Sequence, residues 1–249
     1  MDGAGVPIEP VLYGDPGANA GIVLVHGWGG SAATMAVPSA TLADAGYLAV
    51  AISMRGWGAS GGIDDCGLHQ PDDVSVIVDW VHGQLAAVTG SVGLLGISQG
   101  GQVALLAAAR GASVSAVAAW AAVTDVRAWR AETQHPGIPG YIDETCADGD
   151  LEARSPIIVA ERLAHLPVLL VHGDSDTRVP TEQSRRLHAA IVRAGGRASL
   201  VVLEGIGHQR GPAGNRAALD ATLRFFATEL LSGADTSVAR MGGGDRPEE

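Results

Sequence analysis

The chain has 249 residues, of which 47% are hydrophobic and 17% charged, and its formal net charge is −11 at pH 7. This length and composition predict one folded domain with a large core and exclude a disordered chain. The longest apolar stretches fall short of the ~18 residues that a membrane helix needs, and the sequence has no basic segment typical of nucleic-acid binding. All 16 basic residues are arginine, which excludes mechanisms that depend on a lysine.

The chain ends and the cysteines indicate the compartment. Residues 1–10 carry acidic side chains and no apolar segment, so we expect no signal peptide and a cytoplasmic location. Cys66 and Cys146 lie in different loop-like stretches and form no metal-binding pattern. Free thiols are the expected state, with a disulfide between them as the alternative. We expect a single domain over residues 1–232, followed by a disordered, glycine-rich tail at 233–249.

Short apolar segments alternate with longer helical segments along the chain. We expect strands at residues 21–26, 47–53, 91–97, 115–123 (in part helical), 166–172 and 198–203. We expect helices at residues 32–45, 71–88, 99–110, 181–194 and 213–231. This alternation predicts an α/β fold with a mostly parallel sheet that helices cover on both faces. Catalytic residues of such folds gather at the carboxyl ends of the strands.

Residues 125–164 interrupt this alternation, because about 40 residues are too many for a simple connection. We interpret the segment as a cap-like insertion of helix and loop that lies over the strand ends. We therefore expect Trp129 and Tyr141 of the insertion, together with Trp57 of an earlier loop, to line the substrate pocket. The alternative is an excursion of the chain that lies far from the site.

The pentapeptide Gly96-Ile97-Ser98-Gln99-Gly100 lies between a predicted strand and a predicted helix. A serine on such a sharp turn has its hydroxyl exposed above the end of the sheet, and the crowded turn requires small residues two positions away on either side. The helix that follows points its free N–H groups at the same place. Ser98 is therefore the predicted nucleophile, and a buried structural serine is the alternative.

A serine hydroxyl needs a general base, and a histidine base needs a carboxylate to orient it. Two later strand ends supply both groups. His208 closes the motif EGIGH, and Asp176 lies in the loop HGDSDTRVP. Asp174, in the same loop, is the alternative acid, and its other possible role is to hydrogen-bond the turn. The order Ser98, Asp176, His208 is the one expected of an α/β-hydrolase.

The tetrahedral intermediate of acyl transfer also needs hydrogen-bond donors for its oxyanion. We expect one donor to be the backbone N–H of Gln99, which follows the nucleophile. The other is expected from the motif HGWGG at residues 26–30, with the Trp28 N–H as first choice and the Gly29 N–H as second. A site of this kind needs neither a metal ion nor an organic cofactor.

Five motifs in this order resemble the α/β-hydrolase superfamily, and within it the prolyl oligopeptidase catalytic domain and the dienelactone-hydrolase-like esterases. They are HGWGG (26–30), RGWGASGG (55–62), GISQGG (96–101), the segment from SPI to RVP (155–180) and EGIGH (204–208). The resemblance implies an α/β-hydrolase fold. It also implies a triad of Ser98, Asp176 and His208, with Trp28 and Gln99 as oxyanion donors.

These features together predict a serine hydrolase that acts on an ester or thioester of a small-molecule acyl compound, with no nucleic-acid or membrane partner. The chain has no room for the propeller of the oligopeptidases and no glutamate pair placed to hold a peptide amino terminus, which favours an esterase over a peptidase. The alternatives are an aminopeptidase-like amidase, an acyltransferase or lactone-forming cyclase with the same triad, and a binding module without activity. The sequence does not indicate an oligomeric state.

Overall fold

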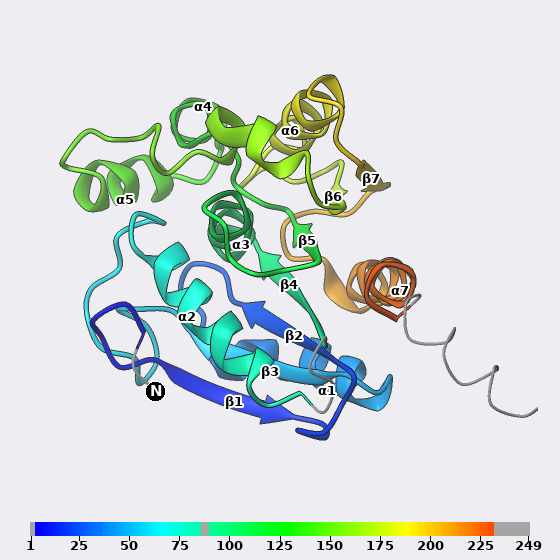
Figure 1. Ribbon diagram of the computed structural model, residues 1–249. Helices are drawn as coiled ribbons and strands as arrows, with labels where there is room; N and C mark the ends of the chain where they lie inside the picture. The colour runs from blue at the N-terminus through cyan, green and yellow to red at the C-terminus, as the bar shows by residue number, and fades with distance from the viewer. Residues whose placement is uncertain (1–2, 86–89, 232–249) are drawn as a thin grey trace, which may run out of the picture.

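The computed structural model describes residues 3–85 and 90–231 and contains a seven-stranded sheet in the order β1-β3-β2-β4-β5-β6-β7 (Figure 1). β1 runs antiparallel to β3, and all the other neighbouring pairs are parallel. The strands are β1 (Glu9–Tyr13), β2 (Ala20–Val25), β3 (Leu48–Ser53), β4 (Ser91–Ile97), β5 (Ala116–Trp120), β6 (Val168–Gly173) and β7 (Ala198–Leu203). The predicted α/β-hydrolase fold with a mostly parallel sheet is confirmed.

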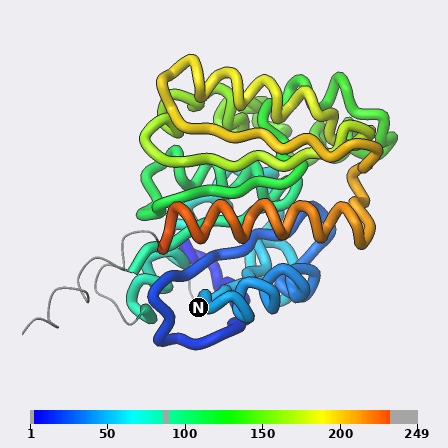
Figure 2. The backbone as a smooth tube through the Cα atoms, turned by 90° about the vertical axis from the view of Figure 1, so that its right-hand side faces the viewer, coloured from blue at the N-terminus to red at the C-terminus, as the bar shows by residue number. Residues whose placement is uncertain are grey.

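Helices cover both faces of the sheet. One face packs against α1 (Ala36–Asp44), preceded by the short η1 (Ala32–Met35), and against α7 (Gly211–Leu231). Figure 2 shows α7 crossing that face. The other face packs against the three helices α2 (Gln70–His82), α3 (Gln99–Ala109) and α6 (Glu182–Arg193). The helix expected at residues 71–88 therefore ends at His82, and residues 86–89 lie outside the described part of the chain.

The central strand β2 shows why the strands are apolar along their whole length. Val23 and Val25 pack into the core on the α2 and α3 side, whereas Ile22 and Leu24 pack into the core on the α1 and α7 side. All four side chains are fully buried. Because neighbouring side chains of a strand point to opposite faces, a sheet that is covered on both sides needs apolar residues at every position.

The sequence patterns did not predict β1, which lies at the edge of the sheet. Its residues are half-buried or exposed rather than fully buried, and it contains Pro10. Proline is tolerated at an edge because one side of an edge strand has no ladder to complete. A short strand without an apolar run has no periodicity that distinguishes it from a loop.

The structure divides the predicted insertion at residues 125–164 into two parts. The helices α4 (Val126–Glu132) and α5 (Ile138–Thr145) form a separate apolar cluster with the loop residues Cys66 and Val179. By contrast, η2 (Pro156–Leu163) packs against α3 and α6 and joins the main core. Only the part up to α5 is therefore a cap, because Leu163 and its neighbours complete the helical layer.

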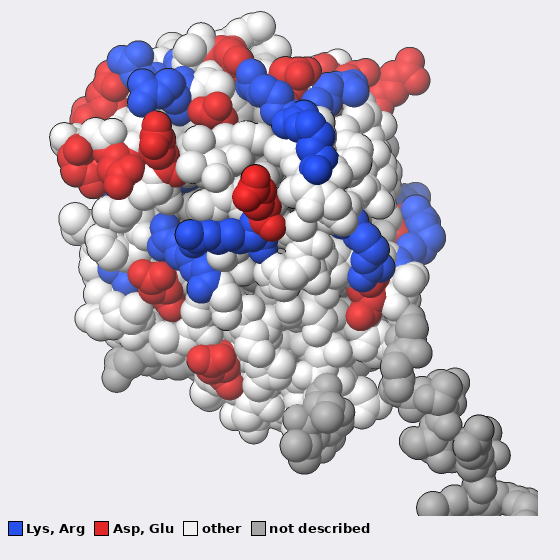
Figure 3. All heavy atoms as spheres, turned by 45° about the horizontal axis from the view of Figure 1, so that its top comes forward, with Lys and Arg blue, Asp and Glu red and all other residues white. Residues whose placement is uncertain are grey.

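The remaining expectations concern the cysteines, the surface and the tail. Cys66 and Cys146 are both buried and both free. None of the helices within residues 3–85 and 90–231 is long and apolar enough to cross a membrane. The face drawn in Figure 3 carries arginine and acidic side chains interspersed with one another. The predicted tail at 233–249 lies outside the described residues.

Candidate active site

Ser98 occupies a strained turn between β4 and α3. Its backbone has φ 57° and ψ −118°, a conformation that residues other than glycine seldom adopt. A Cβ atom at Gly100 would overlap the carbonyl oxygens of Val25 and His26, and one at Gly96 would overlap the backbone of Gly100. The two outer glycines of the pentapeptide are therefore required by the close approach of neighbouring backbone, which explains their spacing about Ser98.

This crowding leads to a stability prediction. We expect Gly100→Ala to lower the free energy of unfolding by at least about 2 kcal/mol, because the added methyl group must displace β2 backbone. Urea denaturation followed by circular dichroism measures the change. Gly140→Ala in α5 is the matched control, since no atom lies near its Cβ position and alanine favours a helix. Equal unfolding midpoints for the two variants would contradict the proposed role of Gly100.

The structure brings the three predicted triad residues together from loops after β4, β6 and β7. His208 Nδ1 lies 2.7 Å from Asp176 Oδ2, and His208 Nε2 lies 3.1 Å from Ser98 Oγ. A carboxylate can only accept hydrogen bonds, so Nδ1 carries the proton and donates it to Asp176. Nε2 is then free to accept the hydrogen bond of the Ser98 hydroxyl, which is the arrangement a general base requires.

Asp176 is buried, and its carboxylate has several donors. Its side chain is 0% exposed, and Oδ1 accepts the backbone N–H groups of Arg178 (3.0 Å) and Val179 (2.9 Å). Burial acts to raise the pKa of Asp176, but hydrogen bonds from His172 and His208 outweigh it and hold the pKa below its ordinary value. The carboxylate is therefore ionised and orients the imidazole.

Two residues near Asp176, namely Asp174 in the same loop and His172 in β6, have structural partners. Asp174 is exposed, and its Oδ1 accepts the backbone N–H of Gly205 (2.8 Å) and the hydroxyl of Ser175 (3.0 Å), so it links two loops. His172 Nε2 lies 2.8 Å from the Val179 carbonyl oxygen and 3.4 Å from Asp176, so its N–H points mainly at the carbonyl. Of the two candidate acids, the structure places Asp176 against His208.

Two backbone N–H groups next to Ser98 are available as donors. Within the described chain, neither the Trp28 N–H nor the Gln99 N–H has a hydrogen-bond acceptor. The Trp28 loop passes close to the nucleophile, since a Cβ at Gly27 would lie 3.2 Å from Ser98 Cβ. His26 holds this loop, with Nε2 accepting from Met54 N–H (2.9 Å) and Nδ1 2.8 Å from the Gly27 carbonyl. Burial lowers the pKa of His26, which favours the neutral ring that this pattern needs.

The side chain of Gln99 belongs to a polar network that the sequence did not reveal. Its Nε2 donates to the Tyr141 hydroxyl (2.7 Å) and to Asp64 Oδ1 (3.1 Å), and Tyr141 in turn donates to Asp64 Oδ2 (2.7 Å). Burial is the main cause that raises the pKa of Tyr141, so its hydroxyl stays protonated and donates. The expected substrate contact Tyr141 therefore connects the cap to the residue after the nucleophile. Asp64 follows the motif RGWGASGG, but no spacing rule pointed to it.

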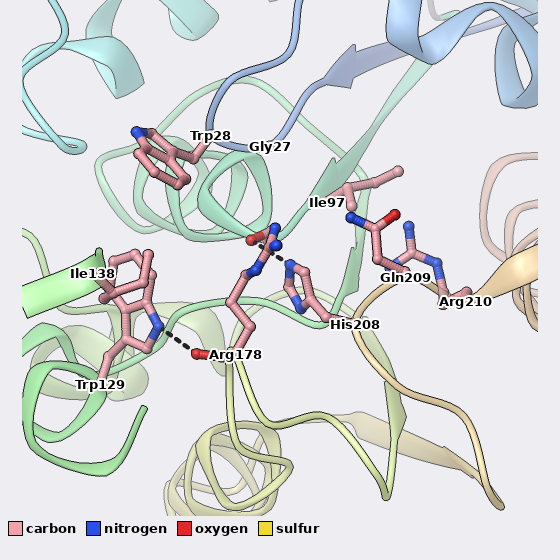
Figure 4. Close-up of a pocket in the computed structure, with 10 residues that line it drawn as sticks. Gly27, Trp28, Ile97, Trp129, Ile138, Arg178, His208, Gln209 and Arg210 are labelled. Carbon is pink, nitrogen blue, oxygen red and sulfur yellow. Dashed lines mark hydrogen bonds between the residues drawn. The ribbon is translucent and has the colours of Figure 1, made fainter. Parts of the chain in front are cut away.

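A cavity of about 160 Å³ opens at Ser98 and His208 (Figure 4). Trp129 lines it, as predicted, whereas Trp57 and Tyr141 do not; Trp57 packs edge-on against His26, with ring centroids 6.4 Å apart. Sequence reasoning missed four of the lining residues, namely Ile138, Arg178, Gln209 and Arg210. Within residues 3–85 and 90–231, no three His, Cys, Asp or Glu side chains are grouped to hold a metal ion.

Comparisons with known proteins agree with the fold. The model of the prolyl oligopeptidase family matches residues 34–233. The chain is similar in structure to a puromycin-hydrolyzing peptidase of Mycobacterium tuberculosis (TM-score 0.78, 21% identity), a match that covers 90% of this chain and 37% of the peptidase. It is also similar to Est1E of Butyrivibrio proteoclasticus, solved with ferulic acid (TM-score 0.74, 21% identity, 93% and 98% covered).

A third similar structure is a Pyrococcus furiosus esterase (TM-score 0.71, 17% identity), with 90% of this chain and 93% of the esterase covered. No curated protein sequence matches the chain. The chain therefore spans little more than a third of the mycobacterial peptidase but nearly the whole length of the two esterases.

Proposed function

Because the chain belongs to the prolyl oligopeptidase family, a family of hydrolases, we propose that it is a serine hydrolase that cleaves a carboxylic ester or thioester through an acyl-enzyme on Ser98. The observation that carries this proposal is the geometry of His208, whose ring lies within hydrogen-bond distance of both Ser98 Oγ and Asp176. A general base must lie this close to the proton that it removes.

In the acylation step, Ser98 Oγ attacks the substrate carbonyl carbon while His208 Nε2 takes the hydroxyl proton. The positive charge that forms on His208 lies against the ionised carboxylate of Asp176. The Trp28 and Gln99 N–H groups, which have no acceptor among the described residues, donate to the oxyanion, and such donors are most effective where they are already oriented before reaction. His208 then protonates the leaving alcohol or thiol, and the acyl group remains on Ser98.

In the deacylation step, His208 removes a proton from a water molecule that attacks the acyl-enzyme. The second tetrahedral intermediate collapses when His208 returns the proton to Ser98 Oγ, and the carboxylic acid leaves. This sequence requires no metal ion or organic cofactor. The same groups would serve a transferase or a lactone-forming cyclase if an alcohol or amine replaced the water.

Amide hydrolysis is the second candidate, and the similarity to the mycobacterial peptidase favours it. The cavity argues against an aminopeptidase, because none of the residues that line it is aspartate or glutamate, and a protonated amino terminus needs an anionic partner once desolvated. A panel of esters, thioesters and aminoacyl amides of graded acyl length decides between the candidates. Faster cleavage of the amides than of matched esters would favour the peptidase.

The role of Ser98 is tested directly by Ser98→Ala. We expect kcat to fall by about 10⁶-fold and labelling by a fluorophosphonate to vanish, because alanine has no hydroxyl to attack the carbonyl carbon or the phosphorus. The control is Ser175→Ala, which removes an exposed hydroxyl from the loop that carries Asp176. It should leave kcat and fluorophosphonate labelling unchanged. Mass spectrometry that located the label at another residue would overturn the assignment.

A further inference from the structure

Two arginines, Arg178 and Arg210, are among the residues that line the catalytic cavity, and none of these residues is aspartate or glutamate. Arg178 lies two residues after Asp176, and Arg210 lies two residues after His208. Figure 4 shows the Arg178 side chain extending into the cavity toward His208, with Arg210 on the side of His208 away from Trp129. In a chain with a formal net charge of −11, this concentration of positive charge at the reacting group calls for an explanation.

These two arginines differ from the others in their partners. Six arginines hydrogen-bond a carboxylate, in the pairs Arg55–Asp73, Arg110–Asp72, Arg130–Asp143, Arg154–Asp148, Arg186–Glu132 and Arg197–Glu229. Among the described residues, the Arg178 side chain has no hydrogen-bond partner, and Arg210 bonds only the neutral Asn215 side chain (3.1 Å). The other arginines of residues 3–85 and 90–231 that have no carboxylate partner are exposed, namely Arg127, Arg162, Arg185, Arg193, Arg216 and Arg224. Arg178 and Arg210 are instead half-buried.

The surroundings of Arg210 stabilise its guanidinium incompletely. One of its terminal nitrogens is buried without a hydrogen-bond partner, and burial lowers the pKa of Arg210 below its ordinary value, although Asp176 acts in the opposite direction. Its guanidinium carbon lies 5.3 Å from the centre of the Trp120 ring, which stabilises the cation only in part. A desolvated guanidinium with an unpaired N–H donor is stabilised when an anion binds beside it.

The backbone of Arg178 is held on both sides. Its N–H donates to Asp176 Oδ1 (3.0 Å), and its carbonyl accepts from Trp129 Nε1 (2.9 Å) and from the Thr133 hydroxyl (2.8 Å). The dashed line between Trp129 and Arg178 in Figure 4 marks the first of these two side-chain bonds. The cap and the catalytic acid thus position the residue while its side chain stays free for a ligand. Such preorganisation lowers the entropy lost on binding.

From these observations, and resting on the proposed function, we propose that the substrate is a short ester or thioester that carries a carboxylate on its acyl half, bound by Arg178 with Arg210 as a second cation. A planar guanidinium with several donors binds a carboxylate better than any other side chain does. The cavity of about 160 Å³ is small beside the ~300–1,000 Å³ of sites for drug-sized ligands. It therefore suits an acyl chain of a few carbon atoms.

The test compares monoethyl succinate with ethyl butanoate, whose acyl groups have the same chain length and differ in the terminal carboxylate. Hydrolysis of monoethyl succinate consumes one water molecule, breaks the acyl C–O bond and gives succinate and ethanol. We expect the wild-type protein to have a higher kcat/KM for monoethyl succinate than for ethyl butanoate. Arg178→Gln should lower the ratio of the two kcat/KM values by about 10- to 100-fold, and Arg178→Lys should lower it less. An unchanged ratio in Arg178→Gln would overturn the proposal.

Two controls isolate the effect. Arg185→Gln removes one positive charge from an exposed position on α6 and should leave the ratio within about twofold, because Arg185 does not line the cavity and solvent and salt screen an exposed charge. Acetylglycolate, compared with ethyl acetate, places the carboxylate on the alcohol half. A preference for acetylglycolate that exceeds the preference for monoethyl succinate would contradict the assignment of the carboxylate to the acyl half.

A binding measurement separates this proposal from the proposed function. Trp28 and Trp129 line the cavity, so their fluorescence reports the binding of monoethyl succinate, and a Ser98→Ala background in every variant prevents turnover. We expect Kd to rise at least tenfold in Arg178→Gln and to stay within about twofold in Arg185→Gln. If neither ester is cleaved and fluorophosphonate labels no residue, the proposed function fails while this measurement still tests the anion site. Labelling of Ser98 together with an unchanged Kd in Arg178→Gln would reject the anion site alone.

Discussion

Asp176→Asn is expected to lower kcat by about 10⁴-fold while the protein remains folded. The asparagine side chain has nearly the shape of the aspartate, and its carbonyl oxygen can still accept the Arg178 and Val179 N–H groups. Its amide NH₂, however, would face His208 Nδ1, which favours the tautomer with the proton on Nε2. That tautomer cannot accept the Ser98 proton. Initial rates with an activated ester measure the loss.

The matched control is Asp174→Asn, two residues earlier in the same loop. Its side chain links Gly205 and Ser175 rather than His208, so we expect less than a tenfold change in kcat. Circular dichroism and the unfolding midpoint verify that both variants are folded. A larger loss of kcat in Asp174→Asn than in Asp176→Asn would assign the acid to Asp174 and refute the geometry described here.

Arg55→Met is expected to lower the free energy of unfolding by about 3–5 kcal/mol. Arg55 makes two short bonds to Asp73, from Nε to Oδ2 (2.6 Å) and from Nη2 to Oδ1 (2.7 Å), and the two side chains are only 12% and 2% exposed. Removing the guanidinium leaves a buried carboxylate without a counter-charge. Urea denaturation at neutral pH measures the change.

Two variants make this prediction specific. Arg55→Met combined with Asp73→Asn should be more stable than Arg55→Met alone, because the uncompensated charge is gone. Arg130→Met breaks a pair of the same two-bond geometry with Asp143, in which the side chains are 45% and 55% exposed. We expect no measurable shift of its unfolding midpoint, since water solvates both charges. Equal destabilisation by the two single substitutions would show that burial does not decide the effect.

Much of the fold could be predicted from the sequence, because the central strands are buried on both faces and are therefore apolar along their whole length. β4 and β7 have the predicted bounds, and the helix expected at 99–110 is α3 with its last residue as the cap. The edge strand β1 was missed because a half-exposed strand with a proline has no apolar run. η2 was assigned to the insertion, although it belongs to the core layer, because a connection and a short covering helix have the same composition.

The positions of the triad candidates could also be predicted, since each follows a strand and carries a local motif. The cavity walls could not, because they depend on how the cap packs. Tyr141 was expected to contact substrate, but its hydroxyl is bonded to Asp64, a partner 77 positions away in the sequence. Arg178 and Arg210 were overlooked because an arginine in a loop is usually solvated, and only the fold shows that these two are half-buried without a carboxylate partner.

The hydrogen bonds between the cap and the catalytic loops have a consequence for protein engineering. Tyr141 bonds the side chain of Gln99, while Trp129 and Thr133 bond the carbonyl of Arg178. A cap transplanted from another hydrolase would leave these polar groups without partners and free the loop that carries the acid. The cap is therefore not an interchangeable module, and a new specificity is better sought by varying Ile138, which lines the cavity, than by exchanging the whole segment.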